Sequence, residues 1–389
     1  MLFFKIIKLL IRCKIIFKAP VKTDILVLDD VSLSKIKLLI NNYDHFVLPI
    51  RYHLIDKVYI SFEILINLIK NFRKTKISTA YFCSLIKTIQ PKLIITVIDN
   101  SLQISDIAKI LGKEFNFLAI QNAARYEFDE HGKEHASKFF IPELACFGNF
   151  EKNLYKKHRI KVKKFFVCGS ITIANYQNFI KLNKKKINFK RKKFDICLIS
   201  EPSPRWNKQF PGFEKALGKI ADFTVKIAKK HNLKLIFAGK RPKFVYENSI
   251  KKINKGYMDE VNFYKNHIKG DFKILQRNVD NYSSYQAMQK SRLSIGMVSS
   301  LLRENFVLGG KSLACNFTNN KTWNFPIQGI CSLNDLDFDK FEKRVLKILS
   351  MSYKNYISKF KQKPNYLIHI NKNKSTQDLL KKKIEDFLI

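Results

Sequence analysis

The 389-residue chain lacks several short motifs that mark common enzyme classes. It contains no G-x-G-x-x-G sequence and no Walker A sequence, which disfavours dinucleotide-dependent oxidoreductases and P-loop nucleotidases. It also contains no C-x-x-C pair, and its seven cysteines are an odd number, several of them in apolar, strand-like runs. Free cysteines in such runs act as small hydrophobic residues, so they indicate a reducing compartment and predict a cytoplasmic protein.

Acidic residues are scarce as well. The chain has 32 Asp and Glu against 72 Lys and Arg, which gives a formal net charge of +40. Such an excess favours an anionic partner such as nucleic acid, phospholipid or a polyanionic substrate. Lys, Ile, Asn and Phe are abundant throughout, however, as an AT-rich genome would produce, so codon bias is an equal explanation. No RNP aromatic motif, KH-type loop or zinc finger is present, and nucleic acid is therefore not the expected partner.

The N-terminal segment lacks an uninterrupted apolar stretch long enough to span a bilayer, and it lacks a small-residue cleavage site. In residues 1–20, short apolar runs alternate with Lys5, Lys8, Arg12, Lys14 and Lys18. As a helix, this segment would present Leu, Ile and Phe on one side with cations beside them, which is typical of an interfacial anchor on an anionic inner membrane. An ordinary first helix packed on the protein body explains the pattern equally well.

Apolar runs of strand length alternate with segments of helical periodicity over most of the chain. In the first half, the expected strands are 24–29, 46–49, 93–98, 115–120, 144–147 and 165–168, and the expected helices are 61–72, 78–89 and 103–111. Gly112 ends the last of these helices. Continuous apolar strands separated by helices predict a parallel sheet covered on both faces. The first domain, 21–183, is therefore expected to be Rossmann-like.

A basic stretch at 184–193 (KKKINFKRKK) interrupts the pattern and is expected to be a linker. The alternation then restarts. The expected strands are 195–200, 233–238, 272–275, 293–298 and 312–317, and the expected helices are 214–230, 259–268, 283–290, one from Ser299, 337–349 and 375–388. We assign 194–350 to a second Rossmann-like domain and 351–389 to C-terminal helices. Two doubly wound α/β domains facing each other would bind ligands in a cleft at the carboxyl ends of their strands.

The region from 291 to 311 carries the strongest functional pattern. An apolar strand runs into Ser299 and Ser300, which open a helix, and Glu304 follows about one turn later before the pair Gly309-Gly310. The start of a helix leaves backbone N–H groups unpaired and carries partial positive charge, so a diphosphate can bind there without a metal. Glu304 is placed to accept hydrogen bonds from a ribose.

Polar and cationic residues also follow the other apolar strands. These loops are Asp99-Asn100-Ser101, Gln121-Asn122-Ala123-Ala124-Arg125, Gly169-Ser170, Ser200-Glu201-Pro202-Ser203-Pro204-Arg205 and Gly239-Lys240-Arg241-Pro242. Carboxyl ends of parallel strands meet at one edge of a sheet, so these side chains are expected to gather there.

As a set, these loops resemble those of bacterial surface-carbohydrate (surface polysaccharide) biosynthesis proteins with a GT-B fold. The segment Ser299-Ser300-x-x-x-Glu304 is similar to the donor-binding helix of many GT-B glycosyltransferases and glycerophosphate-polymer transferases. The resemblance covers roughly residues 22 to 330. Ala123 stands where the family pattern would place a glycine after Gln121-Asn122.

This resemblance implies a metal-independent transferase that moves a sugar or polyol phosphate from a nucleotide-activated donor to a glycan or lipid-linked acceptor, with no cofactor. The amides and hydroxyls of Ser299 and Ser300 would hold the diphosphate with Lys240 and Arg241. Glu304 would hold the ribose. Ser200 and Arg205 are further donor-side candidates.

The acceptor hydroxyl must lose a proton to a carboxylate or an imidazole. The candidates are Asp99, Glu127, Asp129 and His131. Asp99 is preferred because it ends a buried strand, although it could instead cap the helix that begins after Ser101. Asn100 is placed beside it. Arg125 would bind an acceptor phosphate or carboxylate, with a plain surface arginine as the alternative. The acceptor-side candidates are Gln121, Asn122, Gly169 and Ser170.

Two competing functions remain open. Sugar-nucleotide epimerases share this architecture, but they need several acid and base residues around one sugar, and the first-half loops supply few. A basic nucleic-acid-binding protein is suggested by charge alone. The segment 131–135 fits H-x-x-E-H, a zinc pattern, but Gly132 disfavours the helix that the pattern requires, so no metal is expected.

Overall fold

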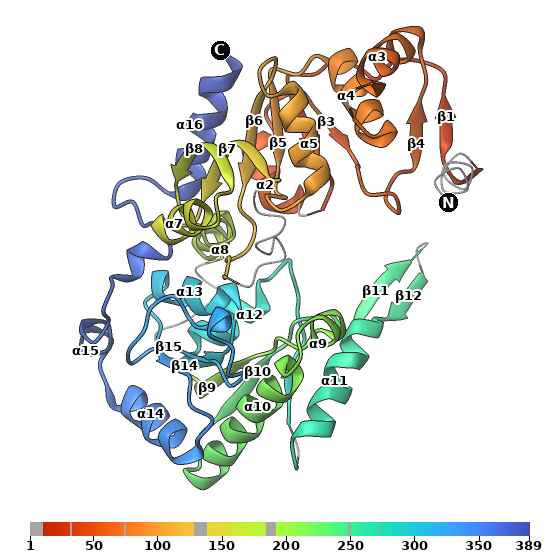
Figure 1. Ribbon diagram of the computed structural model, residues 1–389. Coiled ribbons are helices and arrows are strands. Elements are labelled where there is room, and N and C mark those ends of the chain that lie inside the picture. The colour runs from red at the N-terminus through yellow and green to blue at the C-terminus, as the bar shows by residue number, and fades with distance from the viewer. Residues whose placement is uncertain are drawn as a thin grey trace. The chain divides into compact units, whose positions relative to one another are not determined.

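A computed structural model describes residues 11–31, 33–73, 75–127, 138–183, 192–247, 250–270 and 272–389. The chain forms two compact units, which Figure 1 colours from red to blue along the sequence. Unit 1 comprises Met1–Ala123, Asp129–Ala174 and His369–Ile389. Unit 2 comprises Ala124–Phe128 and Asn175–Ile368.

Unit 1 is built on a six-stranded parallel sheet with the order β3-β2-β5-β6-β7-β8. Its strands are β2 (Ile25–Leu28), β3 (His45–Leu48), β5 (Leu93–Thr96), β6 (Asn116–Ile120), β7 (Phe140–Cys146) and β8 (Lys161–Val167), and β1 (Lys14–Ile16) pairs separately with β4 (Lys57–Tyr59). Its helices are α2 (Leu33–Ile40), α3 (Phe62–Phe72), α4 (Ile77–Ile89), α5 (Leu102–Leu111), α7 (Asn149–Lys157), the first turn of α8 (Ile171–Leu182) and α16 (Thr376–Leu388).

Helices cover both faces of this sheet. One apolar cluster joins alternate residues of β2 and β5, such as Leu26 and Ile94, to α4 and α5. A second cluster joins the intervening residues, such as Ile25 and Ile95, to α2 and α16. Side chains alternate between the two faces of a strand, so a strand that is apolar at every position must be covered on both sides.

Unit 2 is built on a second six-stranded parallel sheet, with the order β13-β10-β9-β14-β15-β16. Its strands are β9 (Phe194–Ile199), β10 (Leu235–Ala238), β13 (Ile274–Leu275), β14 (Ser291–Gly296), β15 (Ser312–Cys315) and β16 (Ser332–Leu333), with a separate hairpin of β11 (Phe244–Glu247) and β12 (Ile250–Ile253). Its helices are α9 (Pro204–Gln209), α10 (Phe213–Lys230), α11 (Lys255–His267), α12 (Ser283–Gln289), α13 (Ser300–Val307), α14 (Phe338–Ser350) and α15 (Tyr353–Ser358), with 3-10 turns at Lys321–Trp323 and Pro364–Tyr366.

The expected pair of Rossmann-like domains is confirmed. In unit 2 the chain first moves outward from β9 to β10 and β13, and then returns to the other side of β9 with β14. In unit 1 it moves from β2 to β3 and then returns with β5. Ligands of open α/β sheets bind at such reversals, outside the carboxyl ends of the two strands. A ligand is therefore expected at the loops after β9 and β14 in unit 2, or at those after β2 and β5 in unit 1.

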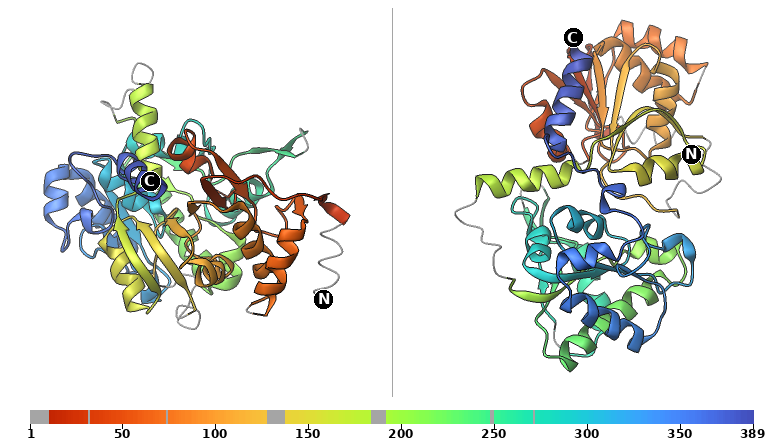
Figure 2. Two further views of the ribbon diagram at one scale, coloured as in Figure 1. Left: turned by 90° about the horizontal axis from the view of Figure 1, so that it is seen from above. Right: turned by 90° about the vertical axis from the view of Figure 1, so that its left-hand side faces the viewer.

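The boundaries of the units differ from those expected. The change falls within α8, at Ala174, and not at the basic stretch 184–193, most of which lies outside the described residues. Tyr176 of α8 packs its ring on Tyr285, 4.8 Å between centroids, and donates a hydrogen bond to Gln289, so this part of the helix belongs to unit 2. At the other end of the chain, α16 belongs to unit 1 (Figures 1 and 2).

The structure also shows the environment of the cysteines and the character of the helices. All seven cysteines are buried and unpaired, as expected for small hydrophobic residues. Among the described residues, no helix combines the length and the apolar character needed to cross a bilayer.

Candidate nucleotide site and acceptor-side loops

In unit 2, the helix start expected at Ser299 is present at the carboxyl end of β14. Ser299 is the N-cap of α13, and its hydroxyl accepts a hydrogen bond from the Leu301 amide at 3.3 Å. Ser299 and Ser300 are half-buried. The N-terminus of α13 therefore lies next to the chain reversal between β9 and β14, where the fold favours an anionic ligand.

Glu201 organises the loop that leads into α13. Its carboxylate is buried and accepts hydrogen bonds from the backbone amides of Met297 at 2.6 Å and Val298 at 2.8 Å. Burial raises the pKa of Glu201, and the two amide hydrogen bonds oppose that rise. These amides are thus already occupied by a carboxyl group that belongs to the protein. The sequence placed Glu201 in the right loop but did not single it out, because its partners lie almost a hundred residues away.

Glu260 organises the next loop in the same way. This buried carboxylate on α11 accepts hydrogen bonds from the amides of Lys240 at 2.8 Å and Arg241 at 3.1 Å, and from the hydroxyl of Ser200. Ser200, a donor-side candidate, is therefore buried and holds this loop in place. Two carboxylates, Glu201 in the loop after β9 and Glu260 on α11, thus hold the backbone at the carboxyl ends of β9, β10 and β14.

Lys240 is the cation of this region with the most altered environment. Its ammonium donates to the backbone carbonyls of Glu201 at 3.0 Å and Pro202 at 3.2 Å, and it lies 5.6 Å from the centre of the Trp206 ring. Burial, and then the neighbouring charge of Arg241, lower the pKa of Lys240 to about 8. Arg241 is exposed beside it, and Arg277 donates to the Lys240 carbonyl at 3.3 Å. Arg277 is a further cation that the sequence analysis did not identify.

Glu304 is hydrogen-bonded to a neighbouring helix. Its carboxylate is buried on α13 and accepts a hydrogen bond of 2.6 Å from the hydroxyl of Tyr285 on α12. Burial, and then the charge of Glu304, raise the pKa of Tyr285 well above its usual value, so this tyrosine stays a hydrogen-bond donor. Because Tyr285 fixes one oxygen of the carboxylate, the orientation of Glu304 is set before any ligand arrives.

A short segment around Arg125 packs on α13 within unit 2. The Ala124 amide donates to the Ser300 hydroxyl at 2.8 Å, and the buried guanidinium of Arg303 donates to the Arg125 carbonyl at 2.5 Å and lies 4.3 Å from the Tyr126 ring centre. Arg125 itself is buried, so the alternative of a plain surface arginine is wrong. The structure thus joins two predicted candidates, Ser300 and the loop after β6, through one hydrogen bond.

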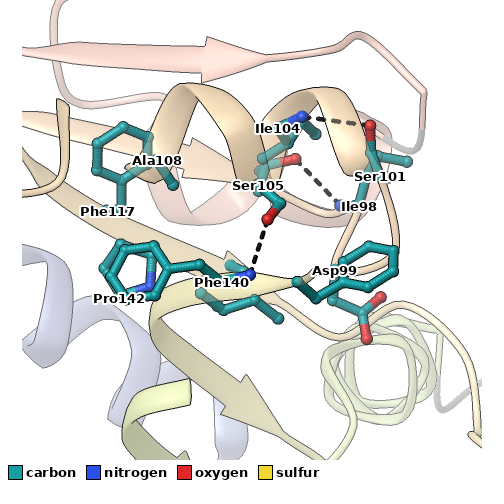
Figure 3. Close-up of a pocket in the computed structure, with 13 residues that line it drawn as sticks. Ile98, Asp99, Ser101, Ile104, Ser105, Ala108, Phe117, Phe140 and Pro142 are labelled. Carbon is teal, nitrogen blue, oxygen red and sulfur yellow. Dashed lines mark hydrogen bonds between the residues drawn. The ribbon is translucent and has the colours of Figure 1, made fainter. Parts of the chain in front are cut away.

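In unit 1, Asp99 is buried and hydrogen-bonded. Its carboxylate accepts from the Tyr155 hydroxyl at 2.6 Å, and Figure 3 shows it turned away from Ser105, Ala108 and Phe117. The adjoining cavity has a volume of about 20 Å³, enough for little more than one water molecule. The alternative role as a helix cap is wrong, because Ser101 is the N-cap of α5 and accepts from the Ile104 amide. Asn100 is half-buried in the same turn.

The acceptor-side candidates lie at the same end of the unit 1 sheet, but most are enclosed. The side-chain amide of Gln121 donates to the Ala123 carbonyl and accepts from the Phe147 amide, so it ties two loops together. Ala123 is not among the described residues with positive φ, and alanine therefore fits where a glycine was expected. The half-buried Asn122 offers its carbonyl to Lys35.

Gly169 and Ser170 are covered by the C-terminal segment. Gly169 has φ of +97°, and a Cβ there would lie 2.6 Å from both the His369 carbonyl and the Thr376 hydroxyl. Ser170 is buried and accepts from the Ile173 amide. These two residues therefore hold the return of the chain onto unit 1.

A cavity that the sequence did not indicate lies at the carboxyl ends of β2 and β3. It has a volume of about 230 Å³, and its wall includes Asp30, Phe46, Lys57 and Tyr59. Burial, and then the neighbouring Asp29 carboxylate, raise the pKa of Asp30. Asp29 in turn accepts from Arg51 at 2.5 Å. No motif distinguishes these residues, because only the sheet brings β2 and β3 together.

Metal-binding geometry is not found. Among the described residues, no group of three or more His, Cys, Asp or Glu side chains is arranged to hold a metal ion. The H-x-x-E-H segment at 131–135 and the candidate base Asp129 lie outside the described residues. The spacing Asp335-x-Asp337 also occurs, but Asp337 caps α14 and Asp335 pairs with Lys340.

The donor-side candidates follow three neighbouring strands of unit 2, because Lys240 and Arg241 come after β10, and Ser299, Ser300 and Glu304 come after β14. Arg205 is the second residue of α9, which follows β9, the strand between those two. Asp99, Asn100, Gln121, Asn122, Gly169 and Ser170 belong to unit 1.

Comparison with known proteins supports the fold. A scan against protein-family models gives no match, and a search of curated proteins gives none either. Solved structures do match. A UDP-GlcNAc 2-epimerase from Methanocaldococcus jannaschii, in complex with UDP-GlcNAc and UDP, is 13% identical with a TM-score of 0.52, covering 93% of this chain and 99% of that one.

Two further structures are similar over nearly the full length. The UDP-GlcNAc 2-epimerase from Neisseria meningitidis, bound to UDP-GlcNAc, is 10% identical with a TM-score of 0.53, covering 94% of this chain and 99% of that one. The S. aureus protein MnaA with UDP is 8% identical with a TM-score of 0.55, covering 95% and 98%. The chain therefore has a GT-B-like fold with two Rossmann-like domains.

Proposed function

We propose that the protein binds a nucleoside-diphosphate sugar or polyol in unit 2 and transfers the activated group to a glycan or lipid-linked acceptor during surface polysaccharide assembly. The observation that carries the proposal is the pairing of Glu304 with Tyr285 on a helix that starts at the chain reversal of a Rossmann-like sheet. Solved structures of the same fold contain UDP or UDP-GlcNAc, which supports a nucleotide ligand of this kind.

On this proposal, the donor is held in three parts. The Glu304 carboxylate accepts hydrogen bonds from the ribose hydroxyls. The first turn of α13, with the hydroxyls of Ser299 and Ser300, donates to the diphosphate. Lys240 and Arg241 supply positive charge that stabilises the diphosphate as it leaves. Fixed donors of this type do not require a metal ion.

With a sugar donor, the acceptor hydroxyl attacks the anomeric carbon while a base takes its proton, and the bond from that carbon to the diphosphate oxygen breaks. With a polyol phosphate donor, the hydroxyl attacks the phosphorus that bears the polyol, and the nucleoside monophosphate leaves. We propose Asp99 as that base, with Tyr155 setting the orientation of its carboxylate at 2.6 Å. Arg125 is proposed to act on an anionic group of the acceptor, with Asn100, Gln121, Asn122, Gly169 and Ser170 on the acceptor side. Ser200 and Arg205 remain donor-side proposals, Ser200 through the loop that it fixes.

A second candidate function is sugar-nucleotide epimerisation, which is favoured by the similarity to the three structures described above. An epimerase changes the configuration of a sugar that stays in one site, and needs acid and base groups on both sides of one carbon. The loop after β6 offers the amides Gln121 and Asn122 in place of carboxylates. This composition favours transfer.

The proposed site is tested by nucleotide-dependent thermal stability. UDP or CDP is expected to raise the Tm of the wild-type protein, because a ligand that binds only the folded state stabilises it by about 2.7 kcal/mol at a hundred times its Kd. Glu304→Gln and Ser299→Ala should lose most of this increase. Ser101→Ala is the matched control, since it removes the equivalent cap from α5 in unit 1 and should keep the full increase.

The two reactions are separated by their products. With UDP-GlcNAc, an epimerase gives a new sugar nucleotide in the absence of acceptor, whereas a transferase releases UDP only when an acceptor is added. Proton NMR of the mixture distinguishes them. An unchanged Tm with every nucleoside diphosphate, or a full Tm increase in Glu304→Gln, would contradict nucleotide binding at α13.

A further inference from the structure

Helix α3 presents an apolar stripe to solvent. Phe62, Leu65, Ile66, Ile69 and Phe72 are all exposed, with Phe62 at 80% and Ile69 at 69% of full exposure. At 3.6 residues per turn, these five positions span roughly 120° of the helix circumference. Exposed apolar residues are common singly, but a continuous stripe on one helix marks an interaction surface.

The described residues of unit 1 leave this stripe exposed. The side of α3 that faces the protein carries Ile64 and Asn71, which are buried, and it packs on α4. Helix α4 in turn packs on α5, so α3 is the outer helix of this layer (Figure 1). The hydrogen bond from Asn71 to Ser84 of α4 is 3.4 Å long and fixes which side of α3 faces inward. The stripe therefore points outward because of packing and not because the helix is loose.

A further exposed aromatic residue, Phe17, extends the stripe at its N-terminal end. Strand β1 pairs with β4, and the Ile60 amide donates to the Ile16 carbonyl at 2.9 Å. Phe17 follows Ile16 directly, and Phe62 lies two residues after Ile60. Phe17 is 81% exposed. The two phenylalanines thus lie on chain segments joined by this hydrogen bond.

The charges around this surface are almost all positive. Lys70, Arg73 and Lys76 are exposed on α3 and just after it. Lys14, the first residue of β1, and Lys18, which follows Phe17, are exposed as well. Glu63 is the one acidic residue of α3. A helix with an apolar face and flanking cations lies in the interface of an anionic bilayer, with the apolar side chains among the lipid tails and the cations at the headgroups.

We propose that the stripe of α3, extended by Phe17, is a docking surface for an anionic lipid bilayer. Charge complementarity selects this occupant, because the cations that border the apolar residues match anionic headgroups. The proposal goes beyond the transferase activity and does not depend on it. It differs from anchoring by the basic segment 1–20, because all of its apolar residues except Phe17 lie on a helix of the folded domain.

Vesicle binding by the full chain tests the proposal. The measurement is co-sedimentation with vesicles of phosphatidylcholine alone, or of phosphatidylcholine mixed with phosphatidylglycerol, without nucleotide. The wild-type protein should bind the mixed vesicles. Phe62→Ser with Ile69→Ser should weaken binding at least about tenfold, since each side chain would lose its burial in the bilayer. Lys70→Gln with Arg73→Gln should weaken binding to the mixed vesicles only.

The matched control removes two exposed apolar residues from unit 2. Ile253 and Val279 are 57% and 54% exposed, so Ile253→Ser with Val279→Ser should bind vesicles as the wild type does. Because all these positions are exposed, the unfolding midpoints should stay unchanged, and this is checked in parallel.

Two results would overturn the proposal. One is equal vesicle binding by the wild type and the Phe62→Ser, Ile69→Ser variant, which would assign binding to the general basic charge or to residues 1–20. The other is absence of vesicle binding together with self-association that this variant abolishes, which would show that a second copy of the chain covers the stripe. Nucleotide-dependent stabilisation is measured separately, so neither result affects the test of the proposed transferase site.

Discussion

Gly296 and Glu201 form a pair in which the smallest side chain makes room for a buried carboxylate. Gly296 ends β14, and a Cβ at this position would lie 2.6 Å from Oε1 of Glu201. That oxygen accepts the hydrogen bond from the Met297 amide. Any side chain at 296 must therefore displace the group that holds the start of the α13 loop, which makes glycine necessary here for reasons of space.

Gly296→Ala is expected to lower the free energy of unfolding by about 1–3 kcal/mol, because a methyl group is forced into a filled, buried site. Urea denaturation provides the measurement. In a Glu201→Ala background the same substitution should cost less, since the carboxylate that it meets is gone. Equal costs in the two backgrounds would show that the contact is not what makes glycine necessary.

For single residues, the sequence identified the loops that carry the candidate side chains, but not what each side chain does. Ser299 is the helix cap that its position suggested, whereas Ser200 and Gln121 hold loops together and are buried. Residue type and position after a strand are visible in the chain. The direction in which a side chain points depends on its partners, and the partner of Ser200 is 60 residues away.

Helix α13 ends where the glycine pair in the sequence predicts. The helix ends at Val307, Gly309 has φ of +73°, and the Gly310 amide donates back to the Asn305 carbonyl, so the glycine pair terminates the helix as expected. Lys311 follows, and its ammonium does not extend the anion site. It donates to the carbonyls of Ile348 at 2.5 Å and Met351 at 2.7 Å, at the C-terminal end of α14.

Lys311→Met is therefore expected to destabilise the protein by about 1–2 kcal/mol, through the loss of a cation from a helix C-terminus. Chemical denaturation of the variant gives the value. Lys347→Met is the control, because Lys347 is exposed in the last turn of α14, whereas Lys311 is the lysine that donates to the Ile348 and Met351 carbonyls. A nucleotide-induced Tm increase that disappears in Lys311→Met would show instead that this lysine belongs to the binding site.

Most long elements matched the sequence pattern within a few residues. Helix α16, expected at 375–388, begins with a capping box formed by Ser375 and Asp378. The sequence analysis missed α2, α7 and the pairing of β1 with β4. Short elements such as β1, with three residues, carry too few positions for a periodic signal, and their existence depends on the strand beside them.

The whole molecule contains many buried thiols, and these make its stability dependent on pH. Burial raises the pKa of Cys83, Cys168, Cys197 and Cys331 from 9.0 to about 12, and raises those of Cys146 and Cys315 further. In the unfolded chain the thiols ionise near pH 9, while in the folded chain they stay protonated. The unfolded state therefore loses protons first, and the free energy of unfolding must fall as the pH rises above 9.

Four lysines act in the opposite direction. Burial lowers the pKa of Lys192 and Lys290, and lowers the pKa of Lys240 and of Lys311 to about 8, so the contribution of Lys240 and Lys311 to stability rises between pH 8 and 10.5. Six thiols, joined by buried tyrosines such as Tyr264 whose pKa is also raised, outweigh four amines, and urea denaturation with reductant should show a net loss of stability from pH 9 to pH 11. Cys197→Ala should show a shallower loss than wild type, since one thiol is removed. Constant or rising stability over that range would contradict the burial of the thiols.

The sequence by itself determined the alternation of apolar strands and amphipathic helices, and with it two parallel sheets, because burial of both faces demands that pattern in every strand. It also determined the helix start at Ser299, since a cap is a local contact. Only the tertiary structure decided which groups meet. Glu201 reaches Met297, Tyr285 reaches Glu304, and α16 returns to the first unit, because each contact joins segments that become neighbours only when the sheets assemble.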